Sequence, residues 1–179
     1  INGGSSFGYY DHYFLAVRQL LKSPASHREN RGAAERVWKV RAKRVILTTG
    51  AIERPLVFAN NDRPGVMLTA AAQEYATRYG TAVGRRVTVF ANNDYAYRSA
   101  LSLQEAGIEV ALIVDPRINP QGAWPARARD AGIAVQDGSA IVDVHGEKRV
   151  TGATVARIKG ETADLGDRRE VDCDTILNS

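Results

Sequence analysis

Apolar runs alternate with polar, glycine-containing segments along the 179 residues of the chain. From residue 86 to residue 115 the sequence reads as a strand (RVTVF), a turn, a helix (YAYRSALSLQEAG) and a second strand (EVALIVD). This order is typical of a compact βαβ unit. The pattern therefore predicts an α/β fold, with WPARARDAG as a further short helix and more strands after it.

The first segment mixes aromatic and β-branched residues over positions 5 to 21, SSFGYYDHYFLAVRQLL, and predicts one or two strands. Its last part, FLAVRQLL, also fits a short helix on spacing alone. His12 falls in a strand in this interpretation, and four aromatic side chains are expected to pack on a sheet face rather than stack on a cofactor: Phe7, Tyr9, Tyr10 and Tyr13. A polar loop is expected over residues 22 to 35.

The run VILTT, which begins at Val45, is continuously apolar, as expected for a buried parallel strand. It ends at Gly50, where the missing Cβ permits a sharp turn. Such a Thr-Gly end can present bare main chain to a flavin or an adenine, although a plain strand and tight turn has the same pattern. Taken alone, VILTTGA does not separate the two.

The segment ERPLVFANNDRPGVML, residues 53 to 68, contains two prolines and cannot form a regular helix. It suits a rigid crossing between domains or a loop at the edge of a ligand, but it could equally be a connector whose polar groups satisfy one another. Thr69 is expected to cap a helix that ends at Gly80. The polar residues concerned are Glu53, Arg54, Asn60, Asn61, Asp62 and Arg63.

The turn of the βαβ unit lacks the glycines of a dinucleotide fingerprint, because Ala91, Asn93 and Ala96 occupy their positions. The side chain of Asn93 would fill space that a phosphate needs. Asp94 suits the helix dipole but repels phosphate. Asp115 could accept a hydrogen bond from a ribose hydroxyl or could be a turn residue before Pro116. The pattern favours a fold that is kept and a phosphate site that is lost.

Composition narrows the function classes. The net charge of +4 arises from 24 basic and 20 acidic residues, with no basic run interleaved with aromatics, so nucleic acid is not an expected partner. The single cysteine, Cys173, excludes an internal disulfide and a thiolate metal cluster and suits a reducing cytoplasm. No apolar stretch is long enough to span a bilayer, and the histidine spacing favours no metal site. We also expect no catalytic triad.

Three stretches together resemble one family: FGYYDH (residues 7 to 12), residues 37 to 68 and VFANNDYAYRSALSL (residues 89 to 103). The chain resembles the alpha subunit of heterotetrameric sarcosine oxidase, with opine oxidase and cyanide synthase subunits as more distant relatives. ERPLVFANNDRPGVML is the specific part of this resemblance. In the family, Asn-Asn-Asp at the turn is a shared trait, so the loss of glycines is not peculiar to this chain.

The resemblance implies an FAD/NAD(P)-binding, glutathione-reductase-like fold and oxidative demethylation of sarcosine to glycine. It implies NAD in the alpha subunit, FAD and FMN in the assembled complex, and the beta subunit and smaller subunits as partners. It also implies an internal fragment: a partial first dinucleotide-binding domain (1–82), an inserted Rossmann-like domain (83–165) and a return strand (166–179). Candidate cofactor contacts are Thr49, Gly50, Ala51 and Arg54, with no catalytic residue expected.

Three functions remain open from the sequence. The chain could help an oxidase subunit to hold NAD beside a flavin-bearing partner. It could instead be a structural docking module that binds no cofactor, as Asn93 and Asp94 suggest. The substrate could also be an opine or another secondary amine, because no residue here identifies the substrate.

Overall fold

The structure is a computed structural model that describes residues 1–21 and 34–179. The chain divides into two compact units, Ile1–Ala51 and Ile52–Ser179, and each is described by itself. Most of the polar loop expected over residues 22 to 35 lies outside the described residues.

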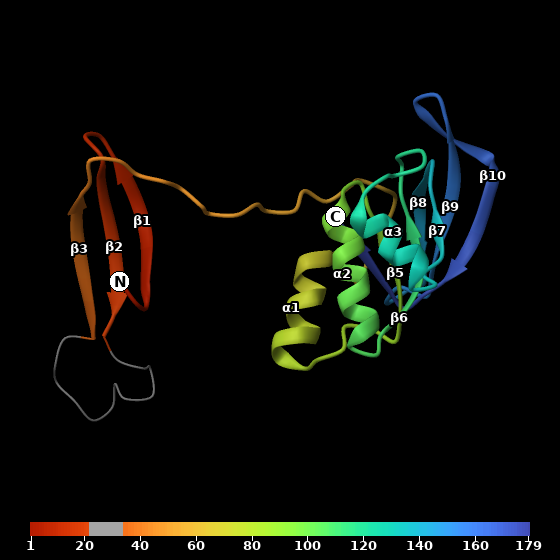
Figure 1. The fold of residues 1–179 in the computed structure, drawn as a ribbon. Helices are drawn as coiled ribbons and strands as arrows, with labels where there is room; N and C mark the ends of the chain where they lie inside the picture. The colour runs from red at the N-terminus through yellow and green to blue at the C-terminus, as the bar shows by residue number, and fades with distance from the viewer. Residues whose placement is uncertain (22–33) are drawn as a thin grey trace. The chain divides into compact units, whose positions relative to one another are not determined.

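The first unit is a three-stranded antiparallel sheet in the order β1-β2-β3 (Figure 1). The strands are β1 (Gly4–Tyr10), β2 (Phe14–Leu20) and β3 (Glu35–Arg41). The prediction of strands over residues 5 to 21 is confirmed, and the helical alternative for FLAVRQLL is wrong. His12, expected in a strand, lies in the turn between β1 and β2. The expectation that the four aromatic residues pack on a sheet face is also wrong, because Phe7, Tyr9, Tyr10 and Tyr13 are all exposed.

The buried strand expected at VILTT is not formed. Residues 42 to 51 have no regular secondary structure, and Ile46 and Leu47 are 87% and 62% exposed. A buried parallel strand requires a neighbouring strand to accept its main-chain hydrogen bonds. Among the described residues, no strand pairs with this run, so its apolar side chains remain at the surface.

The second unit has three layers: helices, a five-stranded parallel sheet in the order β4-β11-β5-β6-β7, and a three-stranded antiparallel sheet in the order β10-β9-β8 (Figure 1). The parallel strands are β4 (Val66–Leu68), β5 (Arg86–Phe90), β6 (Glu109–Val114), β7 (Val135–Gln136) and β11 (Thr175–Asn178). The helices are α1 (Thr69–Tyr79), α2 (Asp94–Glu105) and α3 (Ala123–Asp130). The antiparallel strands are β8 (Ser139–His145), β9 (Gly152–Lys159) and β10 (Thr162–Asp172).

Side chains along the parallel strands point alternately to the two faces of the sheet, which explains why the sheet has an apolar core on each face. Val87 and Val89 of β5 pack with helical residues such as Ala100 in one core cluster, whereas Phe90 packs with Ile141 of β8 in another. Successive side chains of a strand point to opposite faces, so one apolar strand supplies both clusters. The α/β fold and the βαβ unit β5-α2-β6 are therefore confirmed.

Strand β11 lies between β4 and β5, so residues 175 to 178 share a sheet with the βαβ unit. The predicted division at residues 82/83 and 165/166 into a first domain, an inserted domain and a return strand stays a prediction.

Helix α1 begins at Thr69 itself, so the expectation that Thr69 caps the helix is wrong. The preceding residue, Leu68, makes no side-chain cap. The Glu53 carboxylate, distant in sequence, instead accepts a hydrogen bond from the Ala70 amide at 2.7 Å. At the other end Gly80 adopts the left-handed conformation, with φ of 61°, as expected for a helix that ends on glycine.

Candidate functional site

The turn between β5 and α2 is where a Rossmann-type fold holds pyrophosphate. Here Asn93 is the N-cap of α2, and its Oδ1 accepts a hydrogen bond from the Ala96 amide at 3.2 Å. Its Nδ2 donates to Ser179 Oγ at 3.0 Å. A side-chain amide therefore occupies the helix N-terminus that a fingerprint glycine would leave to the ligand, as the sequence predicts.

Arg117 closes the same turn from the end of β6. Its Nη1 lies 2.9 Å from Asp94 Oδ1, and its Nη2 lies 2.8 Å from Asp115 Oδ2. The Arg117 main-chain amide donates to Asp115 Oδ1 at 2.8 Å, and the Tyr97 hydroxyl donates to Asp115 Oδ2 at 2.8 Å. Asp115 is completely buried. These contacts favour the turn-residue interpretation of Asp115 over the ribose acceptor, because its carboxylate is engaged by the protein.

The contacts within this network raise the pKa values of Tyr97 and Arg117. Burial, and then the hydrogen bond to Asp115, raises the pKa of Tyr97. The hydrogen bond with Asp115 is also the largest influence that raises the pKa of Arg117. Tyr97 therefore stays a neutral donor and Arg117 stays a cation at any physiological pH. Neither group suits acid–base chemistry, which needs a pKa near the working pH.

Sequence reasoning missed Arg117. The signal available was a basic residue two positions after the strand-end carboxylate Asp115 and directly after Pro116. A proline there fixes the turn, and an arginine that follows can reach back with five donors. That pattern could have indicated an internal partner for the carboxylates.

The structure places the predicted cofactor contacts at the surface. Thr49, Gly50 and Ala51 lie in the irregular end of the first unit and are exposed. Gly50 has φ of 75°, and no atom lies within 4 Å of where its Cβ would stand. Arg54 is exposed and belongs to the second unit. Their assignment to a dinucleotide stays a prediction.

The segment ERPLVFANNDRPGVML uses its polar groups to bind the sheets of the second unit. Asn60 Nδ2 donates to Asp143 Oδ1 at 2.7 Å, and Arg63 donates to the Val144 carbonyl. The main chain of Leu56 exchanges two hydrogen bonds with the Asn178 side chain, at 2.9 and 2.8 Å. These partners lie outside the segment, so its side chains do not satisfy one another. These hydrogen bonds hold residues 53 to 68, which we call the strap, against strands β8 and β11.

Among residues 1–21 and 34–179, no group of three or more His, Cys, Asp or Glu side chains could hold a metal ion. In the same part of the chain, no helix is long and apolar enough to cross a membrane.

Comparison with known proteins gives three curated relatives, all sarcosine oxidase alpha subunits. The chain is 46% identical to that of Rhizobium meliloti (strain 1021) over 117 residues, which are 63% of this chain and 11% of the relative. It is 38% identical to that of Corynebacterium sp. (strain P-1) over 174 residues, 94% of this chain and 18% of the relative. The chain is homologous to a segment of the sarcosine oxidase alpha subunit.

The relative from Corynebacterium sp. (strain U-96) is 35% identical over 179 residues, 97% of this chain and 18% of its own length. The chain thus spans less than a fifth of the alpha subunits that it matches. No family model matches it. The sequence prediction of sarcosine oxidase alpha subunit homology is confirmed.

Solved structures show the fold. L-proline dehydrogenase from P. horikoshii superposes with a TM-score of 0.54 at 20% identity, covering 97% of this chain and 26% of that one. T. acidophilum thioredoxin reductase gives 0.57 at 17% identity, covering 80% and 46%. The FAD-dependent pyridine nucleotide-disulphide oxidoreductase from Desulfovibrio vulgaris gives 0.55 at 12% identity, covering 99% and 42%. The predicted α/β fold of FAD/NAD(P)-binding oxidoreductases is confirmed.

Proposed function

We propose that the chain is part of the alpha subunit of a flavin-dependent sarcosine oxidase, which converts sarcosine oxidatively to glycine. The similarity to three alpha subunits over up to 97% of the chain supports this assignment most strongly. The segment would contribute dinucleotide binding and subunit contacts in the cytoplasm, and the chemistry would belong to the assembled complex. Its expected partners are the beta subunit and the smaller subunits.

We assign the contacts with NAD in the parent subunit to Thr49, Gly50, Ala51 and Arg54. The open space beside Gly50 supports this, because a ligand can approach main chain that carries no side chain. Arg54 would meet a phosphate as a charged donor. FAD and FMN of the assembled complex would supply the acceptor for the electrons of the amine. The residues of this chain would position and shield, not transfer protons.

Substitution at Gly50 tests the assignment. The full-length subunit carrying Gly50→Leu should retain less NAD after mixing with it than the wild type does. Gly132→Leu is a matched control, because Gly132 also has a positive φ and open space at its Cβ position. NAD retained equally by both variants would remove the assignment, whereas sarcosine-dependent peroxide formation tests the enzyme identity separately.

The Arg117 network favours a second candidate: a structural module that binds no nucleotide in its βαβ unit. Calorimetric titration of the chain with NAD, NADP, FAD and ATP separates the two. Micromolar binding abolished by Gly50→Leu supports the first candidate, and absence of binding to all four supports the second.

The substrate class is the remaining choice. A subunit of an oxidase for an opine or another secondary amine would have the same fold and the same segment. Turnover of sarcosine, proline and opines by the assembled complex decides between them, and we expect sarcosine to be oxidised with the highest kcat/KM.

A further inference from the structure

The loop between β1 and β2 has an unusual main chain. Strand β1 ends at Tyr10 and β2 begins at Phe14, so the loop is residues 11 to 13. His12 and Tyr13 both have positive φ, 59° and 55°. Bulky non-glycine residues rarely adopt this left-handed conformation, and two in a row are less favourable still. Such local strain persists mostly where a surface serves a function.

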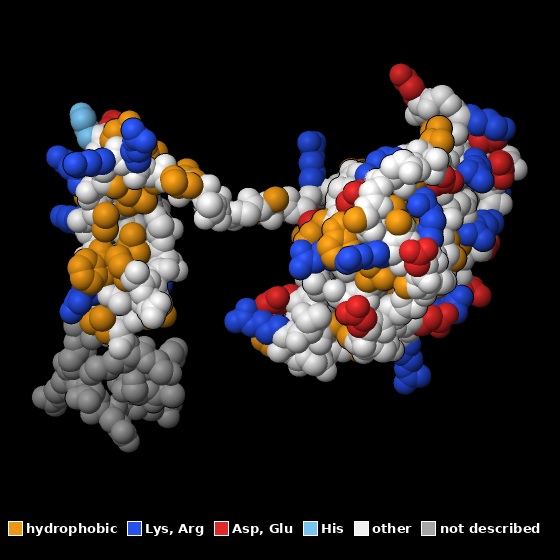
Figure 2. Space-filling view, viewed as in Figure 1, with side chains coloured by type: hydrophobic (Ala, Val, Ile, Leu, Met, Phe, Trp, Pro, Cys, Tyr) orange, Lys and Arg blue, Asp and Glu red, His pale blue; other side chains and the backbone are white. Residues whose placement is uncertain are grey.

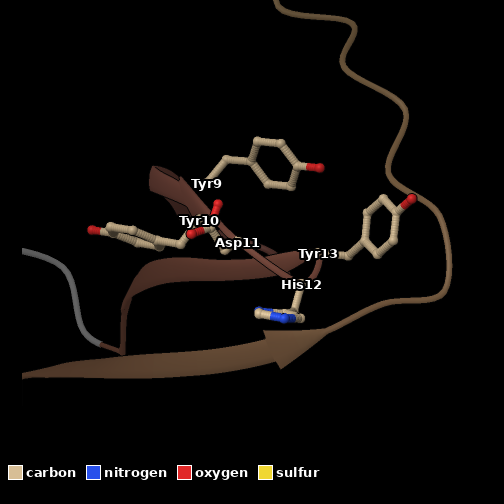
Figure 3. Close-up of a pocket in the computed structure, with 5 residues that line it drawn as sticks. All are labelled: Tyr9, Tyr10, Asp11, His12 and Tyr13. Carbon is tan, nitrogen blue, oxygen red and sulfur yellow. The ribbon is translucent and has the colours of Figure 1, made fainter.

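Residues 9 to 13, which we call the hairpin tip, expose aromatic rings. Tyr9, Tyr10 and Tyr13 are 51%, 52% and 52% exposed, and with Asp11 and His12 they line a hollow of about 550 Å³. Figure 3 shows the three rings pointing in different directions from the loop. The rings therefore offer separate anchors rather than a single stacking platform. Exposed tyrosines gathered at the tip of one hairpin are a feature of protein-binding surfaces.

The unit that carries the hairpin tip is also the basic part of the chain. Its described residues include six Lys or Arg and two Asp or Glu, whereas residues 52 to 179 include 15 and 17. Figure 2 shows Lys and Arg side chains gathered over the end of this sheet. Arg18 pairs with Glu35, but within the described residues five cations of this unit have no ion-pair partner: Arg36, Lys39, Arg41, Lys43 and Arg44.

Three of these cations, Arg41, Lys43 and Arg44, lie next to the hairpin tip. Phe14, the first residue of β2, pairs with Arg41, the last residue of β3. The Ala42 amide donates to the Tyr13 carbonyl at 3.1 Å, which places Lys43 and Arg44 on the chain immediately beyond. Exposed aromatic rings and cations without an ion-pair partner thus lie side by side at one end of this sheet.

We propose that the hairpin tip is a docking surface for an acidic patch on another protein subunit of the assembly. The inference rests on the proposed function for the existence of such subunits. The tyrosines would bury their rings and donate hydroxyl hydrogen bonds, while Arg41, Lys43 and Arg44 pair with carboxylates of the partner. A nucleic acid is a poorer fit because the rings form no common stacking face. An anionic membrane is a poorer fit because Asp11 stands among the rings.

The first test measures association in the native complex that contains the chain. Tyr9→Ser with Tyr13→Asn removes two rings while keeping a residue that tolerates the left-handed conformation. The dissociation constant for the partner should rise at least tenfold, and Arg41→Ala with Lys43→Ala should weaken its dependence on salt. Tyr75→Ser with Tyr79→Ser, two exposed tyrosines on α1, is the matched control and should change it less than twofold.

A photoreactive amino acid at position 13 of the otherwise unchanged protein identifies the occupant without relying on a destabilised variant. A cross-link to an acidic peptide of another subunit supports the proposal. Cross-links confined to the same polypeptide, to nucleic acid or to added vesicles of anionic phospholipid overturn it. Sarcosine turnover in the same preparation keeps the two proposals apart: normal turnover with unaltered association in the tyrosine variant overturns the docking surface alone.

Discussion

Arg117 Nη1 lies 2.9 Å from Asp94 Oδ1, and this contact joins the end of β6 to the first turn of α2. An acidic side chain is stabilised at a helix N-terminus, and the arginine cancels its charge. In a nucleotide-binding relative of this fold, the same place holds a phosphate. The turn of this chain therefore carries its own anion and its own cation, so it is stable without a ligand.

Replacing Arg117 should destabilise the second unit. Arg117→Ala removes the guanidinium from Asp115, which is completely buried, and leaves the Tyr97 hydroxyl and the main-chain amide of residue 117 as its donors within the described residues. Breaking a buried pair on one side costs about 3–5 kcal/mol, and the partial exposure of Arg117 reduces this to about 2 kcal/mol. Urea unfolding measures the loss.

Arg78→Ala is the control for that experiment, because Arg78 forms an exposed i,i+4 pair with Glu74. Its free energy of unfolding should change by about 0.5 kcal/mol or less. Equal losses in the two variants would show that Arg117 has no special structural role.

Tyr97 should remain a phenol when the exposed tyrosines ionise. Burial and Asp115 raise its pKa above the ordinary value of 10. A raised pKa in the folded state means that the contribution to stability is complete below the unfolded pKa and is lost as the pH rises toward the folded value. Alkaline titration followed by phenolate absorbance should show one late tyrosine that disappears in Tyr97→Phe. A late tyrosine retained in Tyr97→Phe would assign it elsewhere.

Local pattern predicted some elements of this fold and not others. The βαβ unit was predictable because strand, turn and helix each have a local signature. Asn93 was recognised as a side chain in a glycine position, but its role as the N-cap of α2 was not predicted. VILTT was not predictable, because an apolar run becomes a buried strand only when neighbouring strands accept its hydrogen bonds. The contacts of Glu53 with Ala70 and of Arg117 with Asp94 were missed because they depend on how segments distant in sequence meet. Only the contact of Arg117 with Asp115 has a local signal, the Asp-Pro-Arg order of residues 115 to 117.

Glu53 should stabilise α1 from outside the helix. Its carboxylate accepts a hydrogen bond from the Ala70 amide. The N-cap residue, Leu68, has no side-chain acceptor for this purpose. Glu53→Ala should lower the free energy of unfolding by about 1 kcal/mol, the usual loss for a helix cap, and Glu53→Gln should lower it less because an acceptor remains. Loss of helical circular dichroism at a given urea concentration checks both variants. Equal destabilisation by the two variants would indicate that the charge, not the acceptor, matters.

Cys173 should be inert in the folded protein. Its thiol is buried, and burial is the largest influence that raises its pKa above the ordinary value. Since the thiolate is the reactive species, iodoacetamide should label the native chain slowly and the urea-unfolded chain fully. Mass spectrometry measures the labelled fraction. Rapid labelling at neutral pH without denaturant would contradict the buried position.

Asn60 should stabilise the strap of residues 53 to 68 in two separable ways. It adopts a left-handed conformation, with φ of 57°, and its amide donates to Asp143 at 2.7 Å. Asn60→Gly keeps the conformation and loses the hydrogen bond, at about 1 kcal/mol, whereas Asn60→Ala loses both and should cost about 2 kcal/mol. The Asn60 hydrogen bond is the largest influence that lowers the pKa of Asp143. The stabilisation is therefore present above the unfolded pKa of that carboxyl and is lost as the pH falls through the lower folded value. Urea unfolding of wild type and Asn60→Gly should accordingly differ at neutral pH and converge in acid, and a constant difference across that range would remove Asp143 from the explanation.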